Sequence, residues 1–260
     1  LAAGGDAWVS LPFDMKHPWE DWNVEGLSGL EVLNLSTVAR AHINIPSLLW
    51  LWPLFRRAGA AAVLRAIAAR PSAALRRWDS LLARGRDWVA VGALDAHAQM
   101  KVGRRKVPIP TYADSFRAAT THVCIPGHGA PAGDSMLEAL RKGRSYFAYD
   151  ILGDPTGFRF EADTGAIMGE RAPVGCVLRV QAAAGTYVRL IHDGRVVADA
   201  TSGRLRWVAQ RPGAYRVEAY QVRFWLGPFG AGARPWVFTN PIRVVDRGDP
   251  LLGAPYGNQF

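Results

Sequence analysis

Cysteine is scarce in this sequence, and long hydrophobic runs are missing. The two cysteines, Cys124 and Cys176, each lie inside an apolar run and lack the close spacing of a metal knuckle, so we expect buried thiols. The most apolar segment is "SLLWLWPLF" at 47–55, and Arg56 and Arg57 interrupt it long before the ~18 residues that a transmembrane helix needs. We therefore expect no membrane span and interpret the segment as the start of a buried or interfacial helix.

Acidic residues are outnumbered by basic ones. The sequence holds 31 Lys and Arg against 22 Asp and Glu, a formal net charge of +9, which favours an anionic partner or substrate. The arginines are spread along the sequence in pairs such as Arg56-Arg57 and Arg76-Arg77, without a long basic tract. We therefore expect no nucleic-acid partner and leave open a small anionic substrate.

Several familiar signals are also missing. No signal peptide begins the sequence, and its first residue is Leu1 rather than Met, so we expect a processed or truncated product of unknown localisation. No Ser-His-Asp set emerges. The Gly-x-Gly of "FGAGARP" precedes strand-like sequence rather than a helix, which argues against a phosphate-binding loop.

The first part of the sequence alternates short apolar runs with helical patterns. Strands are predicted at 7–11, 29–34 and 88–94, and a helix is predicted between Pro71 and Gly85. A capping-box spacing of Ser135 and Glu138 predicts a later helix. Apolar strands separated by helices indicate a parallel sheet covered on both faces, or part of a barrel.

The pattern changes to period two from about Asp154. Alternating residues in "GCVLRVQA" and "AYRVEAY" predict strands, and Asp193-Gly194 predicts a hairpin turn. We predict two domains, an α/β domain over 1–153 and a small antiparallel β-sandwich over 154–260, divided at the turn-rich "YDILGDPTG".

An acid and a histidine follow the third predicted strand, in "WVAVGALDAHAQM" at 88–100. In parallel α/β folds, ligands gather at the carboxyl ends of strands, where Asp95 and His97 fall. Side chains at i and i+2 leave a strand on the same side, and a carboxylate with an imidazole is a common donor set for zinc, manganese or iron. The alternative is an aspartate that caps the next turn beside a structural histidine.

The segment "VAVGALDAHA" resembles the last metal motif of the PHP superfamily, the polymerase and histidinol phosphatase metallohydrolases. Further similarities follow in order: "AAGGDAWVSLPFD", "WEDWNVEGLSGLEVLNL", "WDSLLARGRDWVAVGALDAHA", "SFRAATTHVCIP" and "ALRKGRSYFAYD". They span approximately residues 1 to 150 and look most like the branch that includes carbaryl-hydrolase-like enzymes.

The resemblance implies the C-terminal part of a distorted (β/α)7 barrel that holds divalent cations at the carboxyl ends of its strands. Such cations lower the pKa of bound water towards ~7, so that hydroxide attacks a phosphoester or a related ester or carbamate. By this resemblance Asp95 and His97 bind zinc, manganese or iron, and Asp95 also orients the attacking water. It thus predicts a metal-dependent hydrolase of small-molecule esters.

Two features depart from the family pattern. The family's early His-x-His ligands normally lie upstream of this segment, and no His-x-His occurs in these 260 residues. Relatives commonly have His-Pro where this sequence has Leu11-Pro12, and leucine offers no lone pair to a metal. His17, before Pro18, is a candidate displaced ligand, although its segment fits a variable loop better.

The other polar candidates carry weaker signals. Glu31 either faces the barrel mouth or forms a surface ion pair, and Asn34 is a candidate to support the ligands from behind. Three histidines are interpreted as structural, namely His122, His128 and His192. Two arginines are candidates for contact with an anionic substrate, namely Arg117 and Arg144.

Two other hypotheses about function stay open. Leu11 and the missing histidines favour a catalytically inactive PHP-fold protein with a binding or structural role. A carbohydrate- or surface-binding β domain is suggested by its aromatic residues, although aromatics at alternating strand positions are more often core. These residues are Trp207, Tyr215, Tyr220, Trp225 and Trp236.

Overall fold

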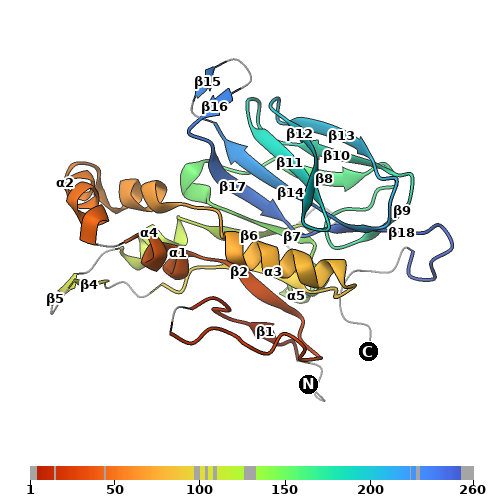
Figure 1. Ribbon diagram of the computed structural model, residues 1–260, viewed down its shortest axis with the longest axis horizontal. Coiled ribbons are helices and arrows are strands. Elements are labelled where there is room, and N and C mark those ends of the chain that lie inside the picture. Colours follow the sequence, from red (N-terminus) through yellow and green to blue (C-terminus); the bar gives the residue numbers. More distant parts are fainter. Residues whose placement is uncertain are drawn as a thin grey trace.

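The computed structural model describes residues 5–14, 16–43, 45–96, 100–102, 105–107, 110–125, 133–222, 224–226 and 229–252. It shows a mixed α/β protein with several sheets, in which the helices gather on one side and the antiparallel strands on the other (Figure 1). In this part of the chain, no helix is long and apolar enough to cross a membrane.

A parallel three-stranded sheet forms the start of the fold. Its strands are β1 Trp8–Val9, β2 Gly29–Asn34 and β3 Val89–Ala93, in the order β1-β2-β3. The central strand, β2, is buried along most of its length, which explains why its sequence is apolar rather than alternating. The three predicted strands and their parallel arrangement are confirmed.

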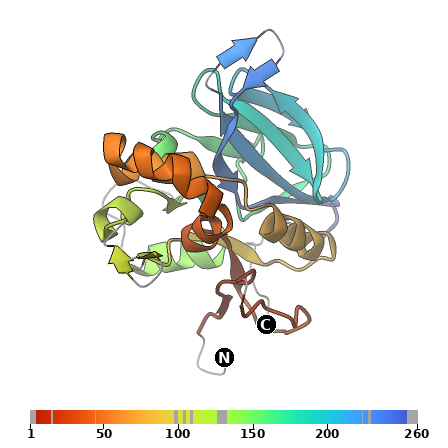
Figure 2. The same ribbon diagram turned by 60° about the vertical axis from the view of Figure 1, so that its left-hand side comes forward.

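Helices pack beside this sheet. They are α1 Leu35–His42, α2 Ile45–Ile67, α3 Ser72–Ala83, α4 Tyr112–Phe116 and α5 Gly133–Arg141, together with the 3-10 helix η1 Asp150–Leu152. In α3, Leu75, Trp78 and Leu82 are spaced to share one face, and all three are buried. Figures 1 and 2 show α3 between β2 and the antiparallel strand β14, Gly213–Gln221.

Two predicted helices are present but differ in detail from the prediction. The helix predicted from Ser135 begins two residues earlier, at Gly133, so the Ser135–Glu138 spacing does not mark its first residue. The segment 47–55 is helical within α2, and Leu51 is buried, but Trp50 and Trp52 are exposed. A run of apolar residues could not show which of them face solvent, because the whole run is equally hydrophobic.

The largest sheet has eight strands, in the order β12-β11-β14-β17-β7-β6, with β18 paired to β14 and β9 paired to β18. Besides β14, its strands are β6 Thr120–Val123, β7 Ser145–Ala148, β9 Arg171–Pro173, β11 Tyr187–His192, β12 Arg195–Ala200, β17 Arg234–Thr239 and β18 Ile242–Val245. The predicted hairpin at Asp193-Gly194 joins β11 to β12. Because β6 and β7 precede residue 153, this sheet contains strands from both predicted domains, and the domain division stays a prediction.

A second antiparallel sheet, of three strands, packs over this one. Its strands are β8 Arg159–Ala162, β10 Val177–Gln181 and β13 Arg204–Val208, in the order β13-β10-β8. Leu178 and Val180 of β10 share a hydrophobic cluster with Val217 of β14 and Val237 of β17. Two hairpins complete the strands, β4 Met100–Val102 with β5 Arg105–Val107, and β15 Phe224–Leu226 with β16 Phe229–Ala231.

Side chains connect the parallel sheet to the eight-stranded sheet. The Asn240 amide accepts a hydrogen bond from the Ala90 amide N (2.8 Å) and donates one to the Ala90 carbonyl (2.9 Å). The Thr121 hydroxyl likewise accepts from the Gly92 amide N and donates to the Gly92 carbonyl, both at 3.0 Å. Two side chains thus satisfy β3 backbone groups that a neighbouring strand would otherwise pair with. The described strands do not close into a barrel.

A buried charge cluster joins α3 to β14. The Arg216 guanidinium donates to both carboxylate oxygens of Asp79 at 2.6 and 2.8 Å and to Glu218 at 2.9 Å. Arg70 donates two further hydrogen bonds to Glu218, at 2.6 and 2.8 Å, and the Tyr220 hydroxyl donates a third at 2.5 Å. Each buried charge therefore has close partners of opposite sign, which offsets the cost of removing it from water.

Candidate functional site

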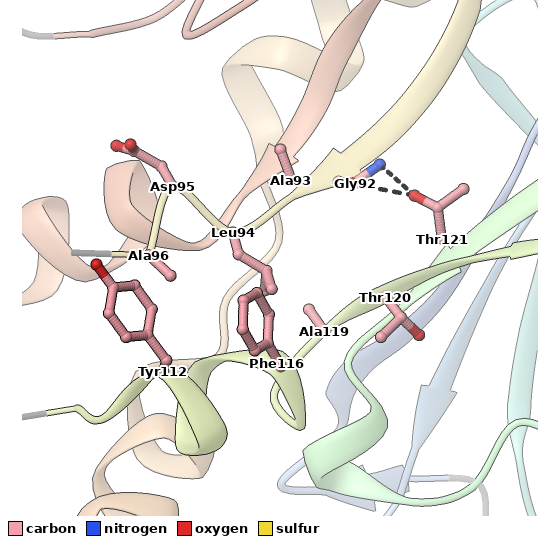
Figure 3. Close-up of a pocket in the computed structure, with 10 residues that line it drawn as sticks. All are labelled: Gly92, Ala93, Leu94, Asp95, Ala96, Tyr112, Phe116, Ala119, Thr120 and Thr121. Atoms are coloured by element: carbon pink, nitrogen blue, oxygen red, sulfur yellow. Dashed lines mark hydrogen bonds between the residues drawn. The ribbon is translucent and has the colours of Figure 1, made fainter. Parts of the chain in front are cut away.

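A cavity of about 640 Å³ lies where the chain leaves β3 (Figure 3). Its lining comes from the end of β3 and the residues after it, from α4, and from the start of β6: Gly92, Ala93, Leu94, Asp95, Ala96, Tyr112, Phe116, Ala119, Thr120 and Thr121. Most of these side chains are apolar, so the cavity offers a hydrophobic wall with few polar groups, as small-molecule sites commonly do.

Gly92 sets how closely β3 approaches the neighbouring strands. A Cβ at this position would lie 2.9 Å from the Phe147 Cβ, closer than such contacts occur, so only glycine fits here without a shift. The close approach also lets the Thr121 hydroxyl reach both backbone groups of Gly92, as Figure 3 shows. This contact fixes the wall of the cavity against β6.

Asp95 lies two residues beyond the end of β3, with a positive φ of 47°. Aspartate tolerates this left-handed conformation better than most residues, at a cost of about 1 kcal/mol. Its carboxylate is 3.8 Å from the Arg40 guanidinium and points away from the Tyr112 and Phe116 rings in Figure 3. The predicted ligand therefore stands at the rim of the cavity, on the side of α1.

Leu11 occupies the matching place after β1, and it too has a positive φ, of 48°. Its amide N donates to the Glu31 carboxylate at 2.9 Å, and the Asn34 amide donates to the same oxygen at 3.2 Å. Asn34 also accepts from the Thr37 amide N and so caps α1. Glu31 and Asn34 thus hold the loop after β1 at the carboxyl edge of the sheet.

Asp14 brings a second carboxylate to this edge. It pairs with Arg40 at 2.9 Å, so one guanidinium contacts both Asp14 and Asp95. Hydrogen bonds from the Lys16 and His17 amide N groups lower the pKa of Asp14. The His17 side chain is exposed. Asp14 and Asp95 thus both contact the same positively charged side chain, that of Arg40.

The residues present fit a divalent cation only in part. A carboxylate at a strand end is a suitable ligand, and Asp95 fits that role. His97 and His128 lie outside the described residues. Within the described ranges, no three His, Cys, Asp or Glu side chains gather closely enough to hold a metal ion. A complete metal site would thus need donors from elsewhere.

The remaining candidates lie away from Asp95 or already have partners. His122 contacts Asp150 at 2.9 Å and stacks on Tyr146, and His192 contacts the Pro212 carbonyl at 3.0 Å and stacks on Tyr215. Both histidines thus have a hydrogen-bond partner and a stacked ring, and their structural role stays an interpretation. Arg144 pairs with Glu170 at 2.6 Å, whereas Arg117 is exposed.

The two cysteines are free thiols in apolar surroundings. Burial raises the pKa of Cys124, and it raises the pKa of Cys176 to about 11. Both therefore stay protonated near neutral pH, so neither is a reactive nucleophile or a ready metal ligand. The expectation of buried thiols is confirmed for Cys176, while Cys124 is half-buried.

Four of the five aromatic residues proposed to bind carbohydrate have described side chains, and none of these four is exposed. Tyr215, Tyr220 and Trp236 are buried, and Trp207 is half-buried against the core between the two sheets. The Trp225 side chain lies outside the described part of the chain. The described members of this set thus favour the core interpretation.

Tyr112, Phe116 and Thr121 line the cavity but are missed by sequence reasoning. Tyr112 and Phe116 stack at 6.2 Å on one face of α4, a helix of five residues that is too short to give a periodic signal. The capping box of Thr111 and Asp114 is the sequence feature that marks this helix.

Comparison with known proteins adds no relative. A scan against models of protein families finds no match, and a search of curated proteins finds no significantly similar sequence.

Proposed function

We propose that this chain is part of a PHP-type metal-dependent hydrolase that cleaves a small-molecule ester, phosphoester or carbamate. Asp95 and His97 would bind zinc, manganese or iron, with further ligands outside the described residues. The architecture that accompanies this proposal is the C-terminal part of a distorted barrel followed by a β-sandwich. The observation that carries the proposal is the position of Asp95 beside a cavity at the carboxyl end of β3.

The backbone at this edge supports the proposal. Three described residues other than glycine have positive φ, and two of them, Leu11 and Asp95, follow the carboxyl ends of β1 and β3, the two outer strands of the same parallel sheet. The third, Asp193, belongs to an ordinary hairpin turn. Strained backbone is retained most often where function requires it, so its concentration here favours a site.

In this proposal each residue of the site has a separate role. A bound divalent cation would supply hydroxide at neutral pH by lowering the pKa of its water towards ~7. Asp95 would hold that water by accepting a hydrogen bond from it. Leu94, Tyr112 and Phe116 would contact the apolar part of the substrate and exclude bulk water, while Arg40 would hold the Asp95 carboxylate in place.

The first test is the metal content of the purified chain, measured by elemental analysis, with turnover of aryl phosphate, aryl acetate and aryl carbamate esters. We expect the parent chain to contain bound metal and the variants Asp95→Asn and His97→Ala to lack it. Asp14→Asn is the matched control, because Asp14 pairs with the same arginine. Full metal content in Asp95→Asn, or turnover that survives it, contradicts the proposal.

A second candidate is an inactive PHP-fold protein with a binding or structural role. The specific observation in its favour is Arg40, whose guanidinium contacts Asp14 and Asp95 where a cation would otherwise balance them. A protonated arginine can substitute for a metal as counter-charge but cannot activate water. This candidate predicts no metal and no turnover, in the parent chain and in Arg40→Gln alike. Metal uptake by either chain excludes it.

A further inference from the structure

The outer face of the three-stranded sheet carries an unusual set of arginines. Strands β8, β10 and β13 lie at the upper right of Figure 1. One cross-strand row on this face is Arg206, Arg179 and Glu161, and the next is Arg204, Gln181 and Arg159. All four arginines are exposed, whereas the intervening Val180 and Leu205 are buried on the inner face.

This face has little negative charge to balance it. Arg179 and Arg206 are direct cross-strand partners, an arrangement of like charges that destabilises a sheet. Glu161 is the single acid in the two rows. Within the described ranges, none of the four guanidinium groups forms an ion pair with an acidic side chain, in contrast to Arg144, Arg171, Arg216 and Arg243.

The two rows border a hollow of about 470 Å³. A volume of this size suits a small molecule. Neighbouring strands lie ~5 Å apart and alternate residues ~7 Å apart, so the rows span only roughly 10 Å by 7 Å. That area is too small for the several phosphate contacts that a nucleic-acid-binding surface makes. The two rows also lack aromatic side chains on which bases or sugars could stack.

We propose that this face binds a small ligand with two or three closely spaced phosphate groups. The guanidinium fork matches the oxygens of a phosphate and can bind two of them at once. Arg179 and Arg206 would share one phosphate, which removes their mutual repulsion. Arg159 and Arg204 would hold the next phosphate across Gln181. The site is separate from the cavity at Asp95 and independent of the activity proposed there.

Isothermal titration of the purified chain with pyrophosphate and tripolyphosphate at physiological ionic strength tests this proposal. We expect saturable binding that Arg179→Gln/Arg206→Gln weakens by about tenfold or more, since charge-assisted contacts to phosphate are lost. The matched control is Arg195→Gln/Arg211→Gln, which removes the same charge from exposed arginines outside the two rows. It should change affinity less than about twofold, because screened long-range charge contributes little.

Glu161→Gln supplies a test in the opposite direction. Removing the acid from this face should tighten binding by about threefold, because it ends one unfavourable interaction with the ligand. A gain in affinity cannot arise from misfolding. Three outcomes would overturn the proposal: no saturable binding, equal losses in the arginine pair and its control, or tighter binding to a single-stranded oligonucleotide or to anionic vesicles than to tripolyphosphate.

Discussion

Two carboxylates of this protein lie beside arginines, in very different surroundings. Glu218 is buried in the cluster between α3 and β14, where two arginines and a tyrosine contact it at 2.5 to 2.9 Å. Asp95 stands half-buried at the rim of a cavity, 3.8 Å from Arg40. Both are acid–arginine contacts, but the first is short and buried, whereas the second is longer and partly exposed.

The difference shows what close pairing does to a charged group. Burial by itself would raise the pKa of Glu218, but hydrogen bonds from Arg70 and the charges of Arg216 and Arg70 lower it to about 2. Glu218 therefore stays ionised and paired in the folded protein at physiological pH. The contact between Asp95 and Arg40 is longer and partly exposed, so solvent screens it more strongly.

The largest expected effect is on the interior cluster. Arg216→Met leaves Asp79 and Glu218 without their shared partner in the core, so we expect a loss of about 3–5 kcal/mol in the free energy of unfolding. Arg40→Met at the rim is the control and should cost less than about 1 kcal/mol. Urea unfolding of both variants measures the difference, and equal losses would remove the distinction drawn between the two regions.

A smaller loss is expected where β3 meets the eight-stranded sheet. Asn240→Ala leaves the amide N and carbonyl of Ala90 without their partners, which should cost about 2–3 kcal/mol. Asn240→Asp keeps an acceptor for the Ala90 amide N but no donor for its carbonyl, and should also destabilise the chain. Asn23→Ala, at an exposed position, is the matched control. If Asn240→Ala has the same midpoint of denaturant unfolding as the parent chain, the contacts of Asn240 do not stabilise the fold as expected.

The cluster also predicts a particular pH dependence. Because the folded pKa of Glu218 lies below the unfolded value of 4.5, its contribution is complete above pH 4.5 and is lost as the pH falls towards 2. The expected loss is on the order of 3 kcal/mol. In Glu218→Gln this part of the acid dependence should disappear, whereas Glu138→Gln, at an exposed position, should retain it. Thermal unfolding between pH 2 and 7 measures both, and an unchanged profile in Glu218→Gln would count against the cluster.

The smallest effect on stability is expected at the rim. Asp95→Asn keeps the size of the side chain and removes a charge whose ion pair is long, so we expect a change within about 1 kcal/mol. Asp79→Asn makes the same exchange inside the cluster and should cost several times more. Guanidinium unfolding compares the two, and a large loss in Asp95→Asn would mean that this residue is structural.

Local patterns explain why part of the fold was predictable. The strands at 29–34 and 88–94, the helix after Pro71 and the Asp193-Gly194 hairpin each carry a signal in neighbouring residues, namely an apolar run, a helical spacing or a turn pair. The pairing of β7 with β17 joins residues some ninety positions apart, and no local pattern carries that information. Asn240 and Ala90 are even farther apart, by 150 positions, so the connection between the sheets could not be predicted from the sequence.

The candidate site was predictable to a similar degree. Asp95 was found because an acid directly after an apolar strand is conspicuous, and it does line a cavity. Its contact with Arg40 was missed, because the sequence alone does not show that α1, which follows β2 directly, places Arg40 beside the end of β3. The wall formed by Tyr112, Phe116 and Thr121 comes from separate segments that only the folded chain places together.

The contacts of Asn240 and Thr121 with β3 also bear on how this protein can change over time. Hydrogen bonds between two backbones depend little on which amino acids are present, since nearly every residue has the same backbone N–H and C=O groups. At this boundary the hydrogen bonds depend instead on two side chains, those of Asn240 and Thr121. One nucleotide substitution can therefore remove hydrogen bonds between the two sheets, so selection can adjust their attachment through single side chains.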